Sequence, residues 1–264
     1  AVGAEVVVCT IPVNLRDCAP FVSQDRPDLG DEQLAKWDAA YQAGIQLEQA
    51  EKFSDALSRF QVASAIDDQF AVLRFRMARC QLRLGQKREA QREYSAARDL
   101  DALRFRTDSR INETIREVAS ERAPHAQLAD AEKNFSAASE SEIPGEDLFL
   151  EHVHMNFKGN YTLASSVFRE ASKILSARLQ QAPDRDFGLL SERACAKRLA
   201  YGSSNRIFTY SKIQDMLLEP PFTSQLDHEE HLKRWDTRVK SAQDELDSAE
   251  MKTEIARHEN ALQR

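Results

Sequence analysis

The sequence contains few cysteines, few glycines and no long apolar run. The four cysteines, Cys9, Cys18, Cys80 and Cys195, are too few and too scattered for a disulfide-built scaffold, and no CxxC motif is present. We therefore expect buried or free thiols, and a bridge between Cys9 and Cys18 stays open from sequence alone. Because no apolar run reaches about 18 residues, we expect no membrane-spanning helix.

The charge balance argues against general attraction to nucleic acid. The formal net charge of the 264 residues is -7, so we expect no nucleic-acid partner. A hydrophobic content of 42% suffices to fill a core, which predicts a folded protein. The chain opens at Ala1, close to the apolar run of Val6 to Val8, without a signal-peptide pattern, and we expect it to be part of something longer. The sequence indicates no compartment.

A repeat of 34 residues is the clearest pattern. In register are Gly44 and Ala78, Ala56 and Ala90, Phe60 and Tyr94, Ala63 and Ala97, Ile66 and Leu100, and Asp67 and Asp101. Small residues fall where helices approach closely and large ones fill the gap. The pattern resembles the tetratricopeptide repeat (TPR) family, which predicts helical hairpins over residues 37–118, with a helix near Ile111, Ile115 and Val118 as a cap. An unrelated helical bundle is the alternative.

Outside the repeats, strands and helices alternate, which predicts an α/β layer. The β-branched run Ala4 to Pro12 predicts a strand, followed by a loop to Gly30, and Ala126 to Ala131 predicts a second strand ending at Asp130, then a helix to Ser139. Helical spacing predicts an amphipathic helix over Tyr161 to Leu179 that packs on this layer through Leu163, Val167, Ala171, Ile174, Leu175 and Leu179. Further helices follow, and Gln225 to Arg264 is charged enough for a long exposed helix or helix pair.

The segment from Asp147 to Asn160 resembles the last motif block of the SGNH (GDSL-type) esterase and lipase superfamily. Glu151 and His154 occupy the places of the acid and the catalytic histidine, and Gly159 opens the following helix. This resemblance implies ester hydrolysis, with His154 as general base and Glu151 orienting its ring. Glutamate replaces the usual aspartate. The Gly-Asp-Ser nucleophile block is absent, and in the family it lies upstream.

Other interpretations of the histidines stay open. His154 could merely pack against or cap the following helix. Together with His152 and Glu151 it offers three metal-ligand types within four positions, although further ligands are lacking, and we assign no metal and no cofactor. The run from Asp227 to His231 lacks the HExxH spacing and is more typical of a solvated charged face.

A second candidate surface is the arginine face of the second hairpin. Arg76, Arg79 and Arg83 recur at i, i+3 and i+7, in the register that lines the concave groove of TPR proteins. Guanidinium groups suit carboxylates, so the expected partner is a protein or acidic peptide, or the chain's own α/β part. A solvated face is the alternative. Tyr41 and Ile45 stand where the family's carboxylate clamp would need lysine and asparagine, so that activity is not transferred.

These observations predict a mainly α fold with a partial α/β layer. Residues 1–30 and 121–182 form the SGNH-hydrolase-like α/β part, residues 31–120 are the inserted TPR hairpins, and residues 183–264 are a helical extension. The expected function is a protein-interaction scaffold that lacks a nucleophile. The alternative is an esterase in a full-length protein, using His154 with Glu151 and an upstream serine.

Overall fold

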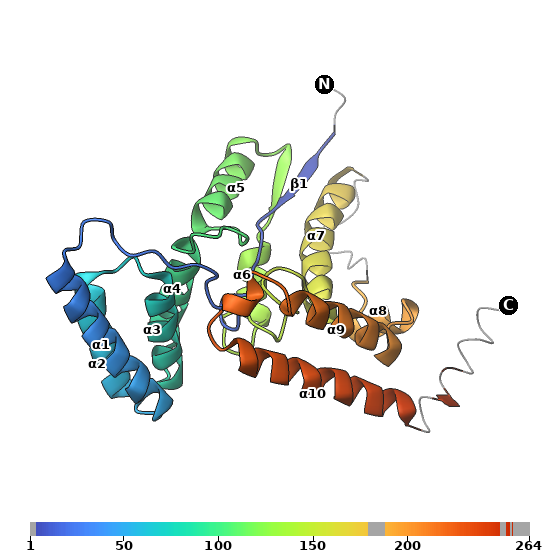
Figure 1. Cartoon of the computed structure of the whole chain (residues 1–264). Coiled ribbons are helices and arrows are strands. Elements are labelled where there is room, and N and C mark those ends of the chain that lie inside the picture. The colour runs from blue at the N-terminus through green and yellow to red at the C-terminus, as the bar shows by residue number, and fades with distance from the viewer. Residues whose placement is uncertain (1–3, 179–187, 249–251, 254, 256–264) are drawn as a thin grey trace. The chain divides into compact units, whose positions relative to one another are not determined.

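The computed structural model describes residues 4–178, 188–248, 252–253 and 255. The chain divides into two compact units, Ala1–Arg185 and Asp186–Arg264. The fold is mainly α, with helical hairpins and a small two-stranded parallel sheet; Figure 1 labels the helices and strand β1. The expected mainly α fold with helical hairpins is therefore confirmed, and its strand part consists of this two-stranded sheet among the described residues.

Four helices form two antiparallel hairpins in the first unit: α1 (Asp31–Gln49) with α2 (Phe53–Ile66), and α3 (Ala71–Arg83) with α4 (Lys87–Asp99). The buried residues of α1 recur three or four positions apart, at Trp37, Ala40, Tyr41, Gly44 and Glu48, as a helix with one packed face requires. The repeat hairpins predicted from the sequence are present.

The 34-residue register is visible in the core. Ala56, Phe60 and Ala63 of α2 are fully buried, and so, to within 2%, are their equivalents Ala90, Tyr94 and Ala97 of α4. Gly44 is needed where α1 approaches α2 most closely, because a Cβ at this position would overlap the ring of Phe60. Small residues therefore set the spacing between the helices and aromatic rings fill it.

The α/β part carries strand β1 (Val6–Cys9), which pairs in parallel with β2 (Ala126–Ala129) in a register that joins Val6 to Ala126 and Cys9 to Ala129. Both predicted strands are confirmed. Helix α5 (Ser109–Glu121) contacts both strands, and Asn112 and Ala119 are its buried residues. The predicted capping stripe faces outward instead, since Ile111 and Val118 are 48% and 44% exposed.

Helix α6 (Ala131–Ala138) follows β2 as predicted, and α7 (Phe157–Arg178) packs against it. Leu163 packs on a buried cluster that contains Phe135 and Phe149. On the rest of the predicted apolar face, Val167, Ala171 and Ile174 are partly buried, whereas Leu175 is 52% exposed. The buried residues of α7 are the small ones Gly159, Ser165, Ser166 and Ser176. Leu179 lies outside the described residues.

The loop between β1 and α1 lies along one edge of the repeat stack. We call residues 21–26 the strap. Asp101 accepts hydrogen bonds from the backbone amides of Phe21 and Val22, and Asp67 accepts one from the amide of Arg26. Between them, the Ser23 hydroxyl accepts from the amide of Val72. The strap therefore ties the α/β part to both hairpins.

The second unit contains α8 (Glu192–Arg198), α9 (Ser203–Leu217), the 3-10 turn η1 (Phe222–Ser224) and α10 (His228–Asp247). Helices α9 and α10 pack together around the fully buried Trp235, whose indole Nε1 donates to His231 Nε2 at 3.0 Å. The run from Asp227 to His231 is thus not wholly a solvated face, because His231 is buried while Glu229 and Glu230 are exposed.

Candidate functional site

The turn that carries Glu151 and His154 is held on both sides. Before it, Leu148 and Phe149 are fully buried, and after it Met155 forms an antiparallel bridge with Phe149. The amide of Leu150 donates to the carbonyl of His154 at 2.7 Å, which closes the turn. Gly159 at the start of α7 lies against the carbonyl of Leu148, where a Cβ would overlap. The glycine predicted to open this helix is therefore required by close packing.

Glu151 is the organising residue of this turn. It is 1% exposed, and its carboxylate accepts hydrogen bonds from the backbone amides of His152, Val153 and His154. The same carboxylate contacts Nδ1 of His154. Because Glu151 occupies Nδ1, Nε2 is the ring nitrogen left to face outward, and the His154 side chain is 65% exposed. The pair predicted from the sequence is thus brought together in the order carboxylate, Nδ1, open Nε2.

Asn14, in the loop after β1, links this turn to the strand layer. It is 1% exposed, its side-chain amide donates to the carbonyl of Glu151, and its backbone amide donates to the carbonyl of His152, both at 3.0 Å. Its own carbonyl accepts from Arg106. The position of the acid–histidine turn therefore depends on a loop that lies 137 residues earlier in the sequence.

Arg106 reaches the same loop from the end of the repeat region. Its guanidinium donates to the carbonyls of Asn14 and Cys18 at 3.0 and 2.7 Å, and pairs with Asp101 at 3.2 Å. Both partners of this ion pair are only 3% exposed. A buried arginine needs acceptors and a counter-charge of this kind. The repeat region and the acid–histidine turn thus share one buried polar network.

His152 lies on the inner side of the turn, against aromatic rings. Its ring is 5.5 Å from that of Phe21 and 6.1 Å from that of Phe105, measured between ring centroids. Burial, with smaller electrostatic effects from Arg106 and His154, lowers the pKa of His152 to about 4. His152 is therefore neutral at pH 7. Phe105 is 52% exposed and presents an apolar surface beside the turn.

The arginine face of α3 pairs with the preceding helix. Arg76, 11% exposed, binds the buried carboxylate of Glu48 and donates to the hydroxyl of Tyr41, and Arg79 contacts the same carboxylate at 3.2 Å. Arg83 is 60% exposed and lies 3.8 Å from Glu51. The structure thus brings the three predicted arginines together, and the carboxylates that it shows beside them belong to the first hairpin and its turn.

Asn14, Arg106 and Glu48 were not singled out from the sequence. Asn14 lies in the loop of a predicted strand and Arg106 follows the repeats, so no local motif marks either residue. Glu48 does carry a signal. A carboxylate on the packed face of α1, four residues after Gly44, needs a cationic partner when it is buried, and the arginines of the next repeat supply it.

The cysteines and candidate ligand groups add no further site. None of the four cysteines forms a disulfide in the described part of the chain, and burial is the largest cause that raises the pKa of the Cys80 thiol to about 12. No cluster of three or more histidine, cysteine, aspartate or glutamate side chains among the described residues is arranged to hold a metal ion. In the same part of the chain, no helix combines the length and apolar character needed to cross a membrane.

Comparison with known proteins identifies the repeats. Residues 47–105 match the tetratricopeptide repeat family, a range that begins near the end of α1 and runs through α2, α3 and α4. No curated protein and no solved structure matches the chain. These comparisons give no support to the resemblance to SGNH hydrolases. What they and the stacked hairpins show together is a tetratricopeptide repeat region at residues 47–105.

Proposed function

We propose that this chain is a protein-interaction scaffold whose repeat hairpins recognise an acidic segment of a partner. The observation that carries this proposal is the gradient of exposure along α3, on which Arg76 is 11%, Arg79 35% and Arg83 60% exposed. The end of the helix therefore presents charge to solvent. TPR regions usually bind proteins, and arginine forks suit carboxylates.

An acidic ligand would compete with the chain's own carboxylates for the arginines of this surface. Glu48 is buried and holds Arg76 in place, so Arg76 supports the surface more than it contacts a ligand. The pair of Arg83 and Glu51 is exposed on both sides, and such pairs contribute little stability. An acidic peptide would therefore displace Glu51 from Arg83 at small cost and add carboxylates beside Arg79.

The test uses a fluorescent decaglutamate peptide, with decaglutamine as the neutral probe, in an anisotropy titration. We expect the variant R79Q/R83Q to weaken decaglutamate binding about ten-fold or more, as for lost hydrogen bonds to charged groups. The matched control is R88Q/R92Q, which removes the same charge from exposed positions of α4. If the two double variants weaken binding equally, the net charge of the chain explains the effect, and the proposed binding surface on α3 is refuted.

A second function is favoured by the geometry of the turn. We propose that Glu151 and His154 are the acid and the base of an ester hydrolase site whose serine is supplied by another segment of a longer protein. The serine Oγ would attack the ester carbonyl while His154 Nε2 takes its proton, and the histidinium would return that proton to the leaving alkoxide. Water would then cleave the acyl intermediate in the same way.

The small sheet of β1 and β2 supports this second proposal, because its two strands have the character of a part of a larger sheet. Parallel sheets generally contain more strands and are covered on both faces, whereas within the described part of the chain β1 has one neighbouring strand and none of its residues is fully buried. Apolar residues on the two helices that contact β1 are also exposed, among them Ile111 on α5 and Phe168 on α7. Further strands along the edge of β1 would cover such residues.

The test of this second function is hydrolysis of 4-nitrophenyl butyrate by the full-length protein and its variants. We expect H154A to lower kcat/KM by about 1,000-fold or more, with E151Q also strongly impaired. The control H125A changes an exposed histidine next to β2. An H154A variant as fast as the unmodified protein would remove His154 from the mechanism and leave the scaffold proposal standing.

A further inference from the structure

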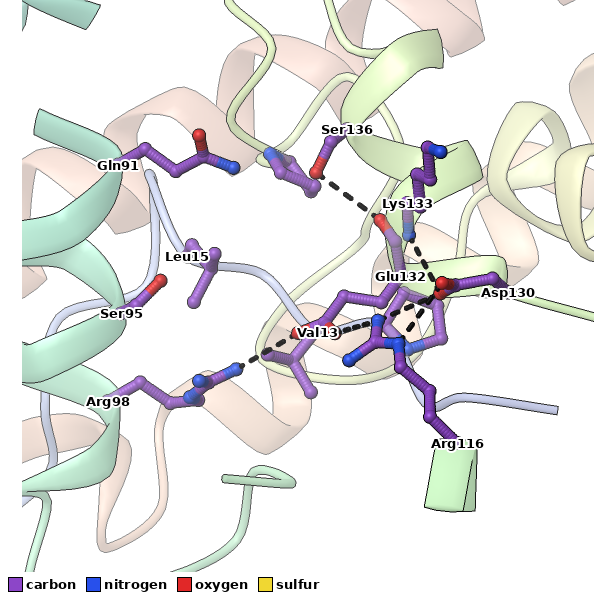
Figure 2. Close-up of a pocket in the computed structure, with 12 residues that line it drawn as sticks. Val13, Leu15, Gln91, Ser95, Arg98, Arg116, Asp130, Glu132, Lys133 and Ser136 are labelled. Carbon is purple, nitrogen blue, oxygen red and sulfur yellow. Dashed lines mark hydrogen bonds and ion pairs between the residues drawn. The ribbon is translucent and has the colours of Figure 1, made fainter. Parts of the chain in front are cut away.

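A pocket of about 420 Å³ lies between the repeat region and the strand layer. Pro12 and Val13, after β1, and Asp130 and Glu132, after β2, line it from one side, while Gln91 and Ser95 of α4 line it from the other (Figure 2). It therefore opens at the carboxyl ends of two parallel strands, where α/β sheets characteristically bind ligands.

The charged groups at one end of the pocket are mutually paired. Arg116 of α5 donates to Asp130 at 2.8 Å and to Glu132 at 2.7 Å, and Glu132 also lies 3.7 Å from the buried Arg98. Burial alone would raise the pKa of Asp130, but hydrogen bonds from Arg116 and Thr10 outweigh it and lower that pKa. This network favours the ionised form of Asp130, and its bonds, drawn as dashed lines in Figure 2, join the side chains into one wall of the pocket.

Three other groups of the lining have unused hydrogen-bonding capacity. In the part of the chain that the structure describes, no hydrogen bond or ion pair engages the side-chain amide of Gln91, the hydroxyl of Ser95 or the ammonium of Lys133. Gln91 and Ser95 lie one helical turn apart on α4, and Lys133 stands on the first turn of α6 across the pocket (Figure 2). Together they supply one cation and two neutral polar groups.

The balance of charge and apolar surface selects the ligand. The positive charges of Arg98 and Arg116 are balanced by Asp99, Asp130 and Glu132, so Lys133 is the cation of the lining that has no carboxylate partner among the described residues. The side chains of Val13 and Leu15 provide an apolar wall. We propose that this pocket binds a small monocarboxylate with a short apolar portion, its carboxylate on Lys133 and its chain against Leu15. This site is independent of the acid–histidine turn and of the arginine surface.

The experiment follows backbone amide NMR shifts of the whole chain during titration with sodium hexanoate, with hexanamide and inorganic phosphate as separate probes. We expect saturable shifts around Ser95 and Lys133. The variant K133M should raise the dissociation constant of hexanoate about ten-fold, because one charged hydrogen bond is lost. The control K173M removes an exposed lysine of α7 and should leave it unchanged within about two-fold.

Two further outcomes are decisive. Hexanamide should bind at least about ten-fold more weakly than hexanoate and should not respond to K133M, since it lacks the charge. The variant S95A, which removes only a hydroxyl, should weaken hexanoate by a smaller factor. The proposal is overturned if hexanoate shows no saturable binding, if its shifts lie away from the pocket, if K133M and K173M behave alike, or if phosphate binds as tightly as hexanoate.

Discussion

Asp67 and Asp101 lie 34 residues apart, and both accept backbone amides from the same strap. Asp101 holds Phe21 and Val22, and Asp67 holds Arg26. Both carboxylates are buried, with exposures of 0% and 2%. Equivalent residues of two successive repeats therefore perform the same task on successive parts of one extended segment, which explains in physical terms why an acidic residue ends each hairpin.

Removing these carboxylates should have unequal effects. We expect D101A to destabilise the protein by about 3–5 kcal/mol, because it leaves the buried guanidinium of Arg106 without its anion. D67A should cost less, about 1–3 kcal/mol, since it leaves only backbone amides unpaired. Urea unfolding measures both, with the exposed D38A as a control expected within about 0.5 kcal/mol. A larger loss for D67A than for D101A would contradict this ranking.

Gly44 should resist replacement even by alanine. Alanine favours a helix by about 1 kcal/mol, but its Cβ would overlap the ring of Phe60 and force it to move, a cost of about 1–3 kcal/mol. We expect G44A to be less stable in thermal unfolding. The double variant G44A/F60L should show favourable coupling of about 1 kcal/mol relative to the sum of the single changes. Strict additivity would mean that the two residues do not meet.

His152 should make stability dependent on pH. Its pKa is about 4 in the folded chain against 6.5 ordinarily, so between these values the unfolded state binds more protons. Stability is full above pH 6.5 and is lost as the pH falls towards 4. From these two values, up to about 2 kcal/mol is lost between pH 7.5 and 5. The groups that face the ring are Arg106, His154 and the carboxylate of Glu151.

The measurement for His152 is urea unfolding at pH 7.5 and at pH 5. The variant H152Q should lose less stability over this interval than the unmodified chain, because it carries no group to protonate there. H125Q, at an exposed position, serves as the control and should follow the unmodified chain. Identical losses in H152Q and in the unmodified chain would assign the acid sensitivity to other groups.

Replacing Trp235 should destabilise the second unit. Its indole donates to the buried His231, so W235F leaves a ring nitrogen without this donor and also removes buried surface. We expect a loss of about 1–3 kcal/mol, measured by urea unfolding with circular dichroism. W37F, which changes the other tryptophan, should not alter unfolding of the second unit. An unaltered midpoint in W235F would refute the structural role of this bond.

The repeat hairpins could be predicted because their signal is local and periodic. Ala56, Phe60 and Ala63 recur as Ala90, Tyr94 and Ala97, and burial follows this register. The faces of α5 and α7 could not be predicted by the same rule. There the buried positions include Asn112, Ser165 and Ser166, while the apolar Val118 and Leu175 are exposed, so the hydrophobic pattern alone does not locate the buried face.

The candidate site, too, could be predicted from the sequence only in part. Glu151 and His154 are three positions apart, and one turn brings them together, so their spacing was informative. The residues that hold this turn are 88 to 137 positions apart along the chain, as in the bonds of Arg106 to Cys18 and of Asn14 to Glu151. Such contacts leave no local pattern. The arginines of α3 were visible as a face, but the carboxylate that pairs with them lies in the preceding repeat.

The strap has a consequence for how this architecture could evolve or be redesigned. The strap contacts Asp101 through Phe21 and Val22 and contacts Asp67 through Arg26. Four or five residues of the strap therefore span one repeat. Inserting one more hairpin between them would need four or five extra residues in a segment far upstream. The number of repeats and the length of the strap are therefore coupled. A gene duplication that added a repeat without lengthening the strap would leave the strap too short to reach both ends of the stack.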